Sequence, residues 1–279
     1  MLTVERWPPL REPLLVVALT GWVDAGFAGT GTMEALAAQL DGAEEFATLD
    51  LTDLLDLQQT RPTARFVSGG LRVIEWPRIT LVSGRVGRDV VLLSGPEPSI
   101  RWPATAAELV DAAERLGVTQ AVTVAGMPAL ASHRRAVPVL ATATSRGLAQ
   151  EIAPLRPDYS GPTGMQTVLQ HALGLAGIPC IGLWAQVPQY VSGSPSPPAV
   201  RAMLGRLAEL FHLDLDLSVL DSRCDAYVEK VDEGLSQRPD VGELVRRLEA
   251  ETENQGEMPS ADELVSEIER FLRSNPDQD

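Results

Sequence analysis

The sequence predicts an α/β protein built on one mixed β-sheet with helices on both faces. Two short apolar segments, Leu14–Leu19 and Cys180–Val187, have the length and composition of strands that are buried on both faces. Each is followed by a loop containing glycine or proline and then by a helical pattern. Residues 64–94 instead carry several strand patterns with no helix between them, which indicates antiparallel pairing.

The first strand, Leu14–Leu19, leads into a turn with Gly26, Gly29 and Gly31 and then a helix that ends near Leu40. This glycine spacing is neither the dinucleotide fingerprint G-x-G-x-x-G nor a phosphate-binding P-loop. We interpret the glycines as residues that allow tight packing. Anion binding at the helix N-terminus is the alternative.

The middle of the chain is predicted to add antiparallel strands and then return to strands separated by helices. A glycine pair, Gly69-Gly70, predicts a β-hairpin. The expected elements are the strand Phe46–Leu51, the hairpin strands Ala64–Ser68 and Leu71–Glu75, the strands Ile79–Val86 and Asp89–Ser94, the helix 104–116, the strand Ala121–Ala125 with the exit loop Gly126–Ala129, and the strand Val137–Ala143.

The segment from Asp158 to Leu204 is predicted to organise the functional region. A turn ends at Gly164, and Thr163 is expected to cap a helix that runs to about Ala176. The strand Cys180–Val187 then delivers a proline-rich loop at its carboxyl end. Because binding sites in open α/β sheets lie at the carboxyl ends of strands, we expect functional residues in these loops.

Two tyrosines and one aspartate stand out in these loops. Tyr159 and Tyr190 are suited to stack on a ligand or to anchor a partner protein, with packing under their own chain as the alternative. Asp24 follows the first strand, where a carboxylate can perform chemistry. We favour a turn or helix-cap role for it.

The C-terminal part is predicted to be helical and acidic. Apolar residues from Leu213 to Leu235 recur at steps of three and four, and a second helix carries Val241 to Leu248. A polar linker is expected at Thr252–Pro259, followed by a last helix that begins with a capping box at Ser260. We therefore expect an α/β core domain over residues 1–205 and an acidic helical extension over residues 206–279.

Composition limits the class of partner. The chain has 279 residues and a net charge of −15, and residues 205–279 hold 20 acidic and 8 basic residues, a net of −12. Nucleic acid is therefore not an expected partner.

No apolar run reaches the roughly 20 residues of a membrane span, and the N-terminus has no signal-peptide core. We expect a cytoplasmic protein with reduced cysteines. The acidic helices are expected either to contact a basic partner surface or to be a solvated face.

The sequence contains few catalytic candidates. The three histidines, His133, His171 and His212, lie far apart and show no zinc-ligand spacing. Lys230 is the only lysine, and no G-x-S-x-G nucleophile elbow is present. We therefore expect no metal, no cofactor and no activated nucleophile.

Three motifs, in this order, resemble the proteasome assembly chaperone 2 family: Gly21–Gly26, Gly161–Gly164, and Val187–Val191 followed by Ser194-Pro195-x-Pro197-x-Ala199. The chain is most similar to the actinobacterial branch, which is arginine-rich and has a C-terminal helical extension. The resemblance implies a three-layer α/β/α sandwich similar to the phosphorylase/hydrolase-like fold of purine nucleoside phosphorylases. It also implies a homo-oligomer, with a trimer as the expected form, and proteasome subunits or other proteins as partners.

The motifs and loops define the candidate ligand- or partner-binding residues, which are Trp22, Asp24, Tyr159, Gly161, Thr163, Gly164, Pro188, Gln189 and Tyr190. One departure concerns docking: chaperones of this family that bind proteasome rings can end in a hydrophobic residue, a tyrosine and a last residue, whereas this chain ends Pro276–Asp279. Two functions stay open. The first is a non-enzymatic protein-assembly factor or scaffold. The alternative is a small-molecule-binding protein or a nucleoside phosphorylase/hydrolase-like enzyme that uses the cleft at the strand carboxyl ends.

Overall fold

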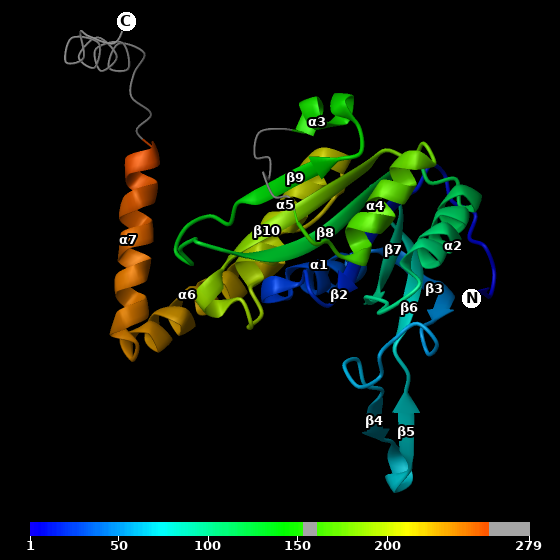
Figure 1. Ribbon diagram of the computed structural model, residues 1–279, viewed down its shortest axis with the longest axis horizontal. Helices are drawn as coiled ribbons and strands as arrows, with labels where there is room; N and C mark the ends of the chain where they lie inside the picture. Colours follow the sequence, from blue (N-terminus) through cyan, green and yellow to red (C-terminus); the bar gives the residue numbers. More distant parts are fainter. Residues whose placement is uncertain (153–160, 257–279) are drawn as a thin grey trace, which may run out of the picture. The chain divides into compact units, whose positions relative to one another are not determined.

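The structure, a computed structural model, describes residues 1–152 and 161–256. In this part of the chain, eight strands form one sheet and two more form a separate hairpin (Figure 1). The strands of the large sheet are β1 (Leu2–Val4), β2 (Leu14–Thr20), β3 (Asp41–Asp50), β6 (Arg78–Val86), β7 (Arg88–Pro96), β8 (Gln120–Ala129), β9 (Val139–Ala143) and β10 (Cys180–Pro188). The hairpin strands are β4 (Thr63–Phe66) and β5 (Arg72–Glu75).

Seven α-helices and four short 3₁₀ turns complete the described elements. The helices are α1 (Ala28–Ala37), α2 (Trp102–Arg115), α3 (Arg146–Ile152), α4 (Met165–Leu175), α5 (Pro197–Phe211), α6 (Asp221–Ser236) and α7 (Pro239–Gly256). The 3₁₀ turns are η1 (Ala25–Phe27), η2 (Ser68–Gly70), η3 (Gln189–Val191) and η4 (Ser218–Leu220).

The large sheet is mixed, with parallel strands at its centre. Its order is β1-β3-β6-β7-β2-β8-β10-β9. Strands β7, β2, β8 and β10 run parallel to one another. Antiparallel pairs extend the sheet from β7 through β6, β3 and β1, and β9 pairs antiparallel with β10 at the other end. The predicted α/β class with a mixed sheet is confirmed.

Side chains of β2 alternate between two apolar cores, one on each face of the sheet. Leu14 and Val16 lie in the core that the sheet forms with α1 and α5, whereas Leu15 and Val17 lie in the core formed with α2 and α4. None of the four is more than 2% exposed. Burial of a side chain of this size stabilises the fold by about 1.5–3 kcal/mol. Because both faces of β2 are buried, every position along the strand favours an apolar residue, which explains the continuous apolar run in the sequence.

Helix α1 begins earlier than expected. It starts at Ala28, so Gly29 and Gly31 lie inside the helix and not in the turn before it. A β-carbon at Gly29 would lie 2.9 Å from the carbonyl oxygen of Val124, and one at Gly31 would lie 2.7 Å from the Cγ2 atom of Val200. The glycines let α1 approach both β8 and α5 closely. Their interpretation as packing residues is confirmed.

Strand β8 continues through Gly126–Ala129, which the sequence predicted to be an exit loop. Parallel pairing with β10 extends to the pair of Ala129 and Pro188 and holds this segment extended. A β-carbon at Gly126 would lie only 2.1 Å from the carbonyl oxygen of Ala25. The glycine therefore marks a close approach of two backbones and not a turn.

Three helix boundaries also differ from the prediction. Thr163 does not cap α4, because Gly164 is its N-cap residue. The helix expected from Leu213 begins only at Asp221, since His212 adopts a left-handed conformation (φ 55°) that ends α5. Helix α7 continues to Gly256, so the first part of the expected polar linker is helical. The expected last helix lies outside the described residues.

The chain divides into two compact units, Met1–Glu233 and Gly234–Asp279. The boundary expected after residue 205 stays a prediction. Among the described residues, no helix combines the length and apolar character that a membrane crossing requires.

The close approach at Gly126 predicts a stability effect. Gly126→Ala is expected to lower the free energy of unfolding by about 1–3 kcal/mol, because the added methyl group overlaps the Ala25 carbonyl oxygen and the backbone must shift. Urea titration followed by circular dichroism measures this change. Gly147→Ala in α3 is the matched control, since its β-carbon has no neighbour within 4 Å, and it should stay within about 1 kcal/mol of the wild type. Equal stability of the two variants would contradict the close approach.

Candidate functional site

The carboxyl ends of β7, β2, β8 and β10 lie at one edge of the sheet, because these four strands are parallel. Strand β2 pairs with β8 only as far as Val17 and Thr123, although β2 continues to Thr20. The chain then passes from β2 to α1 on one face, whereas α4 covers the other face. This is the kind of position at which α/β sheets open a crevice for ligands.

Asp24 lies in the loop between β2 and α1, and its carboxylate is engaged by the first turn of that helix. Its Oδ1 atom accepts hydrogen bonds from the backbone N–H groups of Gly29 (2.8 Å) and Thr30 (3.3 Å), and its Oδ2 atom contacts the Thr30 hydroxyl group. The favoured interpretation of Asp24 as a turn or cap residue is confirmed. Trp22, two residues earlier, is 63% exposed.

The first and third sequence motifs meet at this edge. Gly26 donates a backbone hydrogen bond to the carbonyl oxygen of Ser192 (2.7 Å), and Ser196 donates one to the carbonyl oxygen of Gly26 (2.8 Å). Pro188 is buried at the end of β10, and the exposed Gln189 begins η3. The β2–α1 loop and the β10–α5 loop are therefore fastened to each other.

Glu97, which the sequence did not single out, connects β2 to the second motif. Its backbone N–H donates to the carbonyl oxygen of Thr20 (2.9 Å), and its Oε1 atom accepts a hydrogen bond from the backbone N–H of Met165 at the start of α4 (2.6 Å). A β-carbon at Gly164 would lie 2.6 Å from the same Oε1 atom, so a larger residue there would require the Glu97 side chain to shift. Burial raises the pKa of Glu97, although the hydrogen bond from Met165 opposes this effect.

A carboxylate at the N-terminus of a helix is stabilised by the helix dipole and by the free N–H groups of the first turn. Glu97 therefore supplies a carboxylate at the N-terminus of α4, the end of a helix that favours anions. Gly161 and Thr163 of the same motif are exposed. Tyr159 lies outside the described residues, so its role in stacking on a ligand or anchoring a partner stays a prediction.

Tyr190 belongs to a hydrogen-bond chain with two residues that are distant in sequence. Its hydroxyl oxygen lies 2.8 Å from the Nδ1 atom of His133, and the Nε2 atom of His133 lies 3.0 Å from the Oδ1 atom of Asp232 in α6. The tyrosine and histidine rings pack edge to face, with centroids 5.8 Å apart. The His133 side chain has no exposed surface.

The charged groups Arg134 and Asp232 fix the direction of the hydrogen bond between His133 and Asp232. Arg134 donates to Asp232, which lowers the pKa of that carboxyl group, and the hydrogen bond from His133 acts in the same direction against desolvation. Asp232 is thus an acceptor, so His133 donates to it from Nε2. The tyrosine oxygen in turn accepts the backbone N–H of His133 (3.0 Å).

This hydrogen-bond chain joins the β8–β9 segment, the β10–α5 loop and α6. Both ring nitrogens of His133 are engaged, which makes it a connecting residue rather than a free base.

Within the described residues, no group of three or more His, Cys, Asp or Glu side chains is placed to hold a metal ion. Burial raises the pKa of the Cys180 thiol to about 12, so that group stays protonated at neutral pH.

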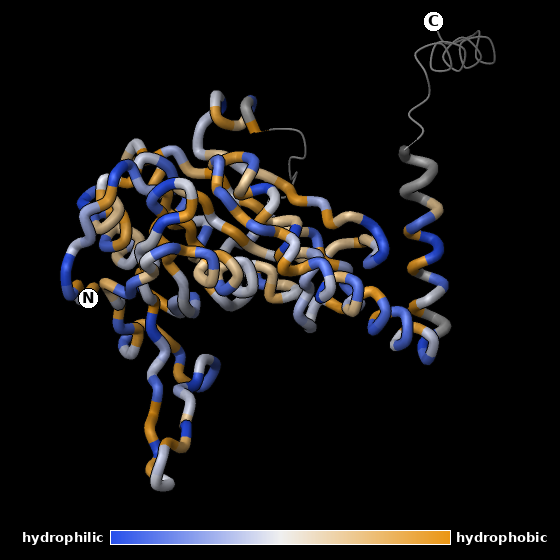
Figure 2. Tube along the Cα trace, turned by 180° about the vertical axis from the view of Figure 1, so that it is seen from behind, coloured by the Kyte–Doolittle hydropathy of each residue, from blue (hydrophilic) through white to orange (hydrophobic). Residues whose placement is uncertain are grey.

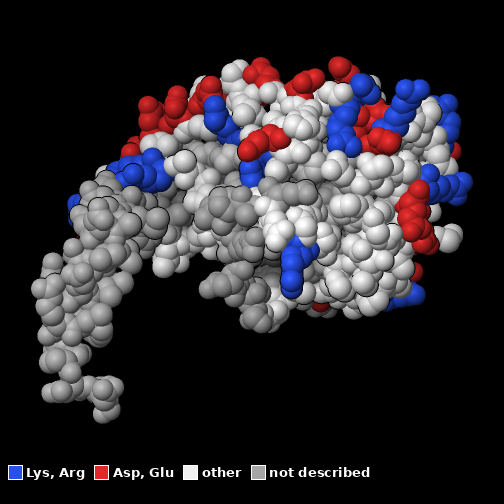
Figure 3. Space-filling model, turned by 90° about the horizontal axis from the view of Figure 1, so that it is seen from above, with Lys and Arg blue, Asp and Glu red and all other residues white. Residues whose placement is uncertain are grey.

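On the face shown in Figure 3, basic side chains are interspersed with acidic ones and do not form a stripe. We call the side of the sheet at which β7, β2, β8 and β10 end the carboxyl edge. The fold and this edge together define the class of protein: a three-layer α/β protein with a mixed sheet, whose loops at the carboxyl edge are held together by structural hydrogen bonds. A family model, the PAC2 family, matches residues 18–234. The chain belongs to the PAC2 family.

Solved structures agree with this assignment. A PAC2 family protein from Streptomyces avermitilis is 38% identical, with a TM-score of 0.77 over 84% of this chain and 99% of that protein. The Mycobacterium tuberculosis proteasome-assembly chaperone homologue Rv2125 is 34% identical, with a TM-score of 0.76 over 83% of this chain and 99% of its own. Rv2714 from the same organism, described as of unknown function, is 28% identical, with a TM-score of 0.83 over 92% of each chain. No curated protein matches the chain.

The Asp232 carboxylate predicts a pH effect on stability. Because its pKa is lower in the folded protein than in the unfolded chain, its contribution is present at neutral pH and is lost as the pH falls below about 5 and through the lowered pKa of the folded protein. Asp232→Asn should therefore lower the melting temperature at pH 7, and the difference from the wild type should shrink over that interval. Glu229→Gln, an exposed change on the same helix, is the control. A constant difference between Asp232→Asn and the wild type across this range would refute the proposed charge state.

Proposed function

We propose that this chain is a non-enzymatic protein-assembly factor that works as a homo-oligomer in the cytoplasm and binds other protein chains. Membership of the PAC2 family supports this function, and so does the engagement of Asp24 and His133 in structural hydrogen bonds. The observation that carries the proposal is the exposed apolar surface of the hairpin formed by β4 and β5.

The hairpin extends away from the large sheet, and its strands pair only with each other (Figure 1). All eight strand residues are exposed. Phe66 is 68% exposed, Leu71 67% and Trp76 52%, and Figure 2 shows hydrophobic segments along the hairpin. An isolated two-stranded hairpin is marginally stable in water, and exposed apolar patches of this kind mark protein interfaces.

The hairpin also differs in charge from the rest of the chain. Residues 61–78 carry four arginines and one glutamate, a net of +3, which leaves −18 for the remainder of a chain whose net charge is −15. The Arg72 guanidinium group lies 5.2 Å from the Phe66 ring centre, where a cation–π contact holds both side chains in place. A basic, apolar hairpin complements a negatively charged partner, and the remainder of a second copy of this chain, with its net charge of −18, has the required sign.

Docking of the hairpin on a different surface of a second copy makes a heterologous interface. Such interfaces form closed rings when the rotation between subunits closes. A trimer, the form that the family resemblance implies, is a small closed ring of this kind. The relative described as a proteasome-assembly chaperone homologue supports proteasome subunits as the class of protein partner.

The alternative function, small-molecule binding or nucleoside phosphorylase/hydrolase-like catalysis, uses the carboxyl edge. The exposed Trp22 and the raised pKa of Glu97 favour a ligand there. The position of the Glu97 carboxylate disfavours phosphorolysis, because an incoming phosphate would meet a negative charge at α4. The likeness to purine nucleoside phosphorylases stays a prediction.

Oligomerisation is tested by light scattering of the full-length chain at micromolar concentration. The wild type is expected at three times the 30.0 kDa mass of one chain. Leu71→Asp is expected at the mass of one chain, because docking of the hairpin on a second copy would bury the new carboxylate in the interface, which costs free energy. Leu175→Asp is the matched control, since Leu175 is 77% exposed but lies on α4. A monomeric wild type, or an oligomeric Leu71→Asp variant, would overturn the role of the hairpin.

The assembly function is tested by purifying the tagged full-length chain from its native host and identifying the proteins that accompany it by mass spectrometry. Proteasome subunits are expected to be enriched relative to an unrelated tagged α/β protein. Leu175→Asp should retain this enrichment. Equal recovery of these subunits with the unrelated protein would count against the proposed function.

A further inference from the structure

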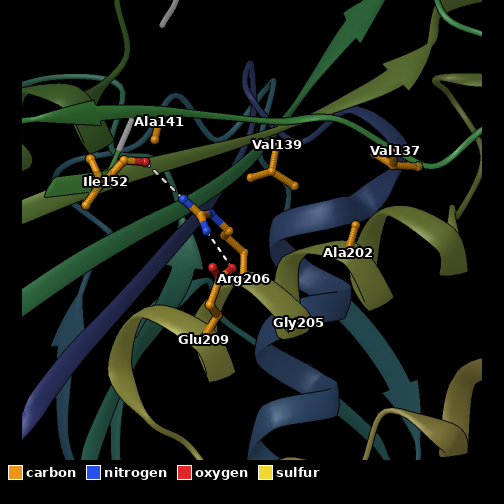
Figure 4. Close-up of a pocket in the computed structure, with 8 residues that line it drawn as sticks. All are labelled: Val137, Val139, Ala141, Ile152, Ala202, Gly205, Arg206 and Glu209. Atoms are coloured by element: carbon orange, nitrogen blue, oxygen red, sulfur yellow. Dashed lines mark hydrogen bonds and ion pairs between the residues drawn. The ribbon is translucent and has the colours of Figure 1, made fainter. Parts of the chain in front are cut away.

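A pocket of about 380 Å³ lies between the edge strand β9 and helix α5, and no candidate residue from the carboxyl edge lines it (Figure 4). This volume falls within the range of about 300–1,000 Å³ found for small-molecule sites. The residues that line it are Val137, Val139, Ala141, Ile152, Ala202, Gly205, Arg206 and Glu209. Its walls are thus apolar apart from one charged pair.

Small residues create the hollow. Ala202 and Gly205 lie on α5, and Ala141 faces them from β9. A β-carbon at Gly205 would have a single neighbour within 4 Å, the Cδ1 atom of Leu217 at 3.6 Å. Ile152, the last residue of α3, adds a further apolar side chain. The space between strand and helix is therefore left open by side-chain size.

Arg206 is the only cation among the lining residues, and its side chain is only 21% exposed. Its guanidinium group donates to the Oε2 atom of Glu209 (2.5 Å) and to the backbone carbonyl oxygen of Ile152 (2.9 Å), as the dashed lines in Figure 4 show. A guanidinium group has five N–H donors, so the described residues leave three of them open. Open donors on a largely buried cation, next to apolar walls, suit an anion that carries an apolar body.

We propose that this pocket binds a small monocarboxylate with an apolar tail. The carboxylate accepts the open N–H donors of Arg206, and the tail packs against Val137, Val139 and Ile152. Glu209 is 67% exposed and already neutralises part of the arginine charge. A single negative charge is therefore matched, whereas the double charge of a phosphate monoester is repelled by Glu209.

Isothermal titration calorimetry of the full-length chain with straight-chain carboxylates from butanoate to octanoate tests the proposal. Affinity should rise by about fourfold per added methylene group until the pocket is filled. Octan-1-ol and octyl phosphate should bind at least about tenfold more weakly than octanoate. Octan-1-ol has no negative charge to pair with Arg206, and the double negative charge of octyl phosphate is repelled by Glu209.

Variants separate this site from non-specific binding. Arg206→Gln should weaken octanoate binding by about tenfold or more, and Glu209→Gln should strengthen it. Arg201→Gln is the matched control on the same helix, because Arg201 pairs with Asp221 and does not line the pocket, and it should leave the affinity unchanged. Since Arg206 also binds the end of α3, a thermal melt must accompany its variant.

A second variant leaves Arg206 in place. Ala202→Leu fills the hollow and is expected to abolish octanoate binding while the protein stays folded. No heat of binding at millimolar octanoate would overturn the proposal. The same conclusion follows if Ala202→Leu binds octanoate as tightly as the wild type, since the ligand would then lie elsewhere.

Discussion

The burial of β2 on both faces is the constraint on which the rest of the structure depends. Its side chains supply both apolar cores, and its parallel neighbours β7 and β8 place their carboxyl ends beside its own. Helices must cover both faces, so α1 and α5 pack on one and α2 and α4 on the other. The loops that carry the family motifs lie where they do because these helices begin at the same edge.

Close packing at that edge leaves little room for side chains. Gly29, Gly31 and Gly126 sit where any β-carbon would collide with a neighbouring strand or helix. Polar groups that enter this region are engaged by backbone N–H groups: Asp24 by the start of α1 and Glu97 by the start of α4. Residues whose type suggests chemistry therefore hold segments together, which agrees with a protein whose partners bind through exposed surfaces.

The central strands could be predicted from the sequence because burial on both faces leaves a continuous apolar run, as in Cys180–Val187. The end of β8 could not, since Gly126 and Pro128 have the composition of a loop and only pairing with β10 keeps them extended. The hydrogen-bond chain from Tyr190 to Asp232 was missed for a related reason. His133 lies 57 positions from one partner and 99 from the other, and no local pattern records a contact at that separation.

The sheet order also has a consequence for synthesis of the chain. Leu14 pairs with Val90 in β7 and with Gln120 in β8, so the most buried strand leaves the ribosome long before either neighbour exists. Until then its apolar side chains have no partner, and non-local pairing of this kind slows folding. The nascent N-terminal segment is therefore the part of this protein most dependent on protection from aggregation during translation.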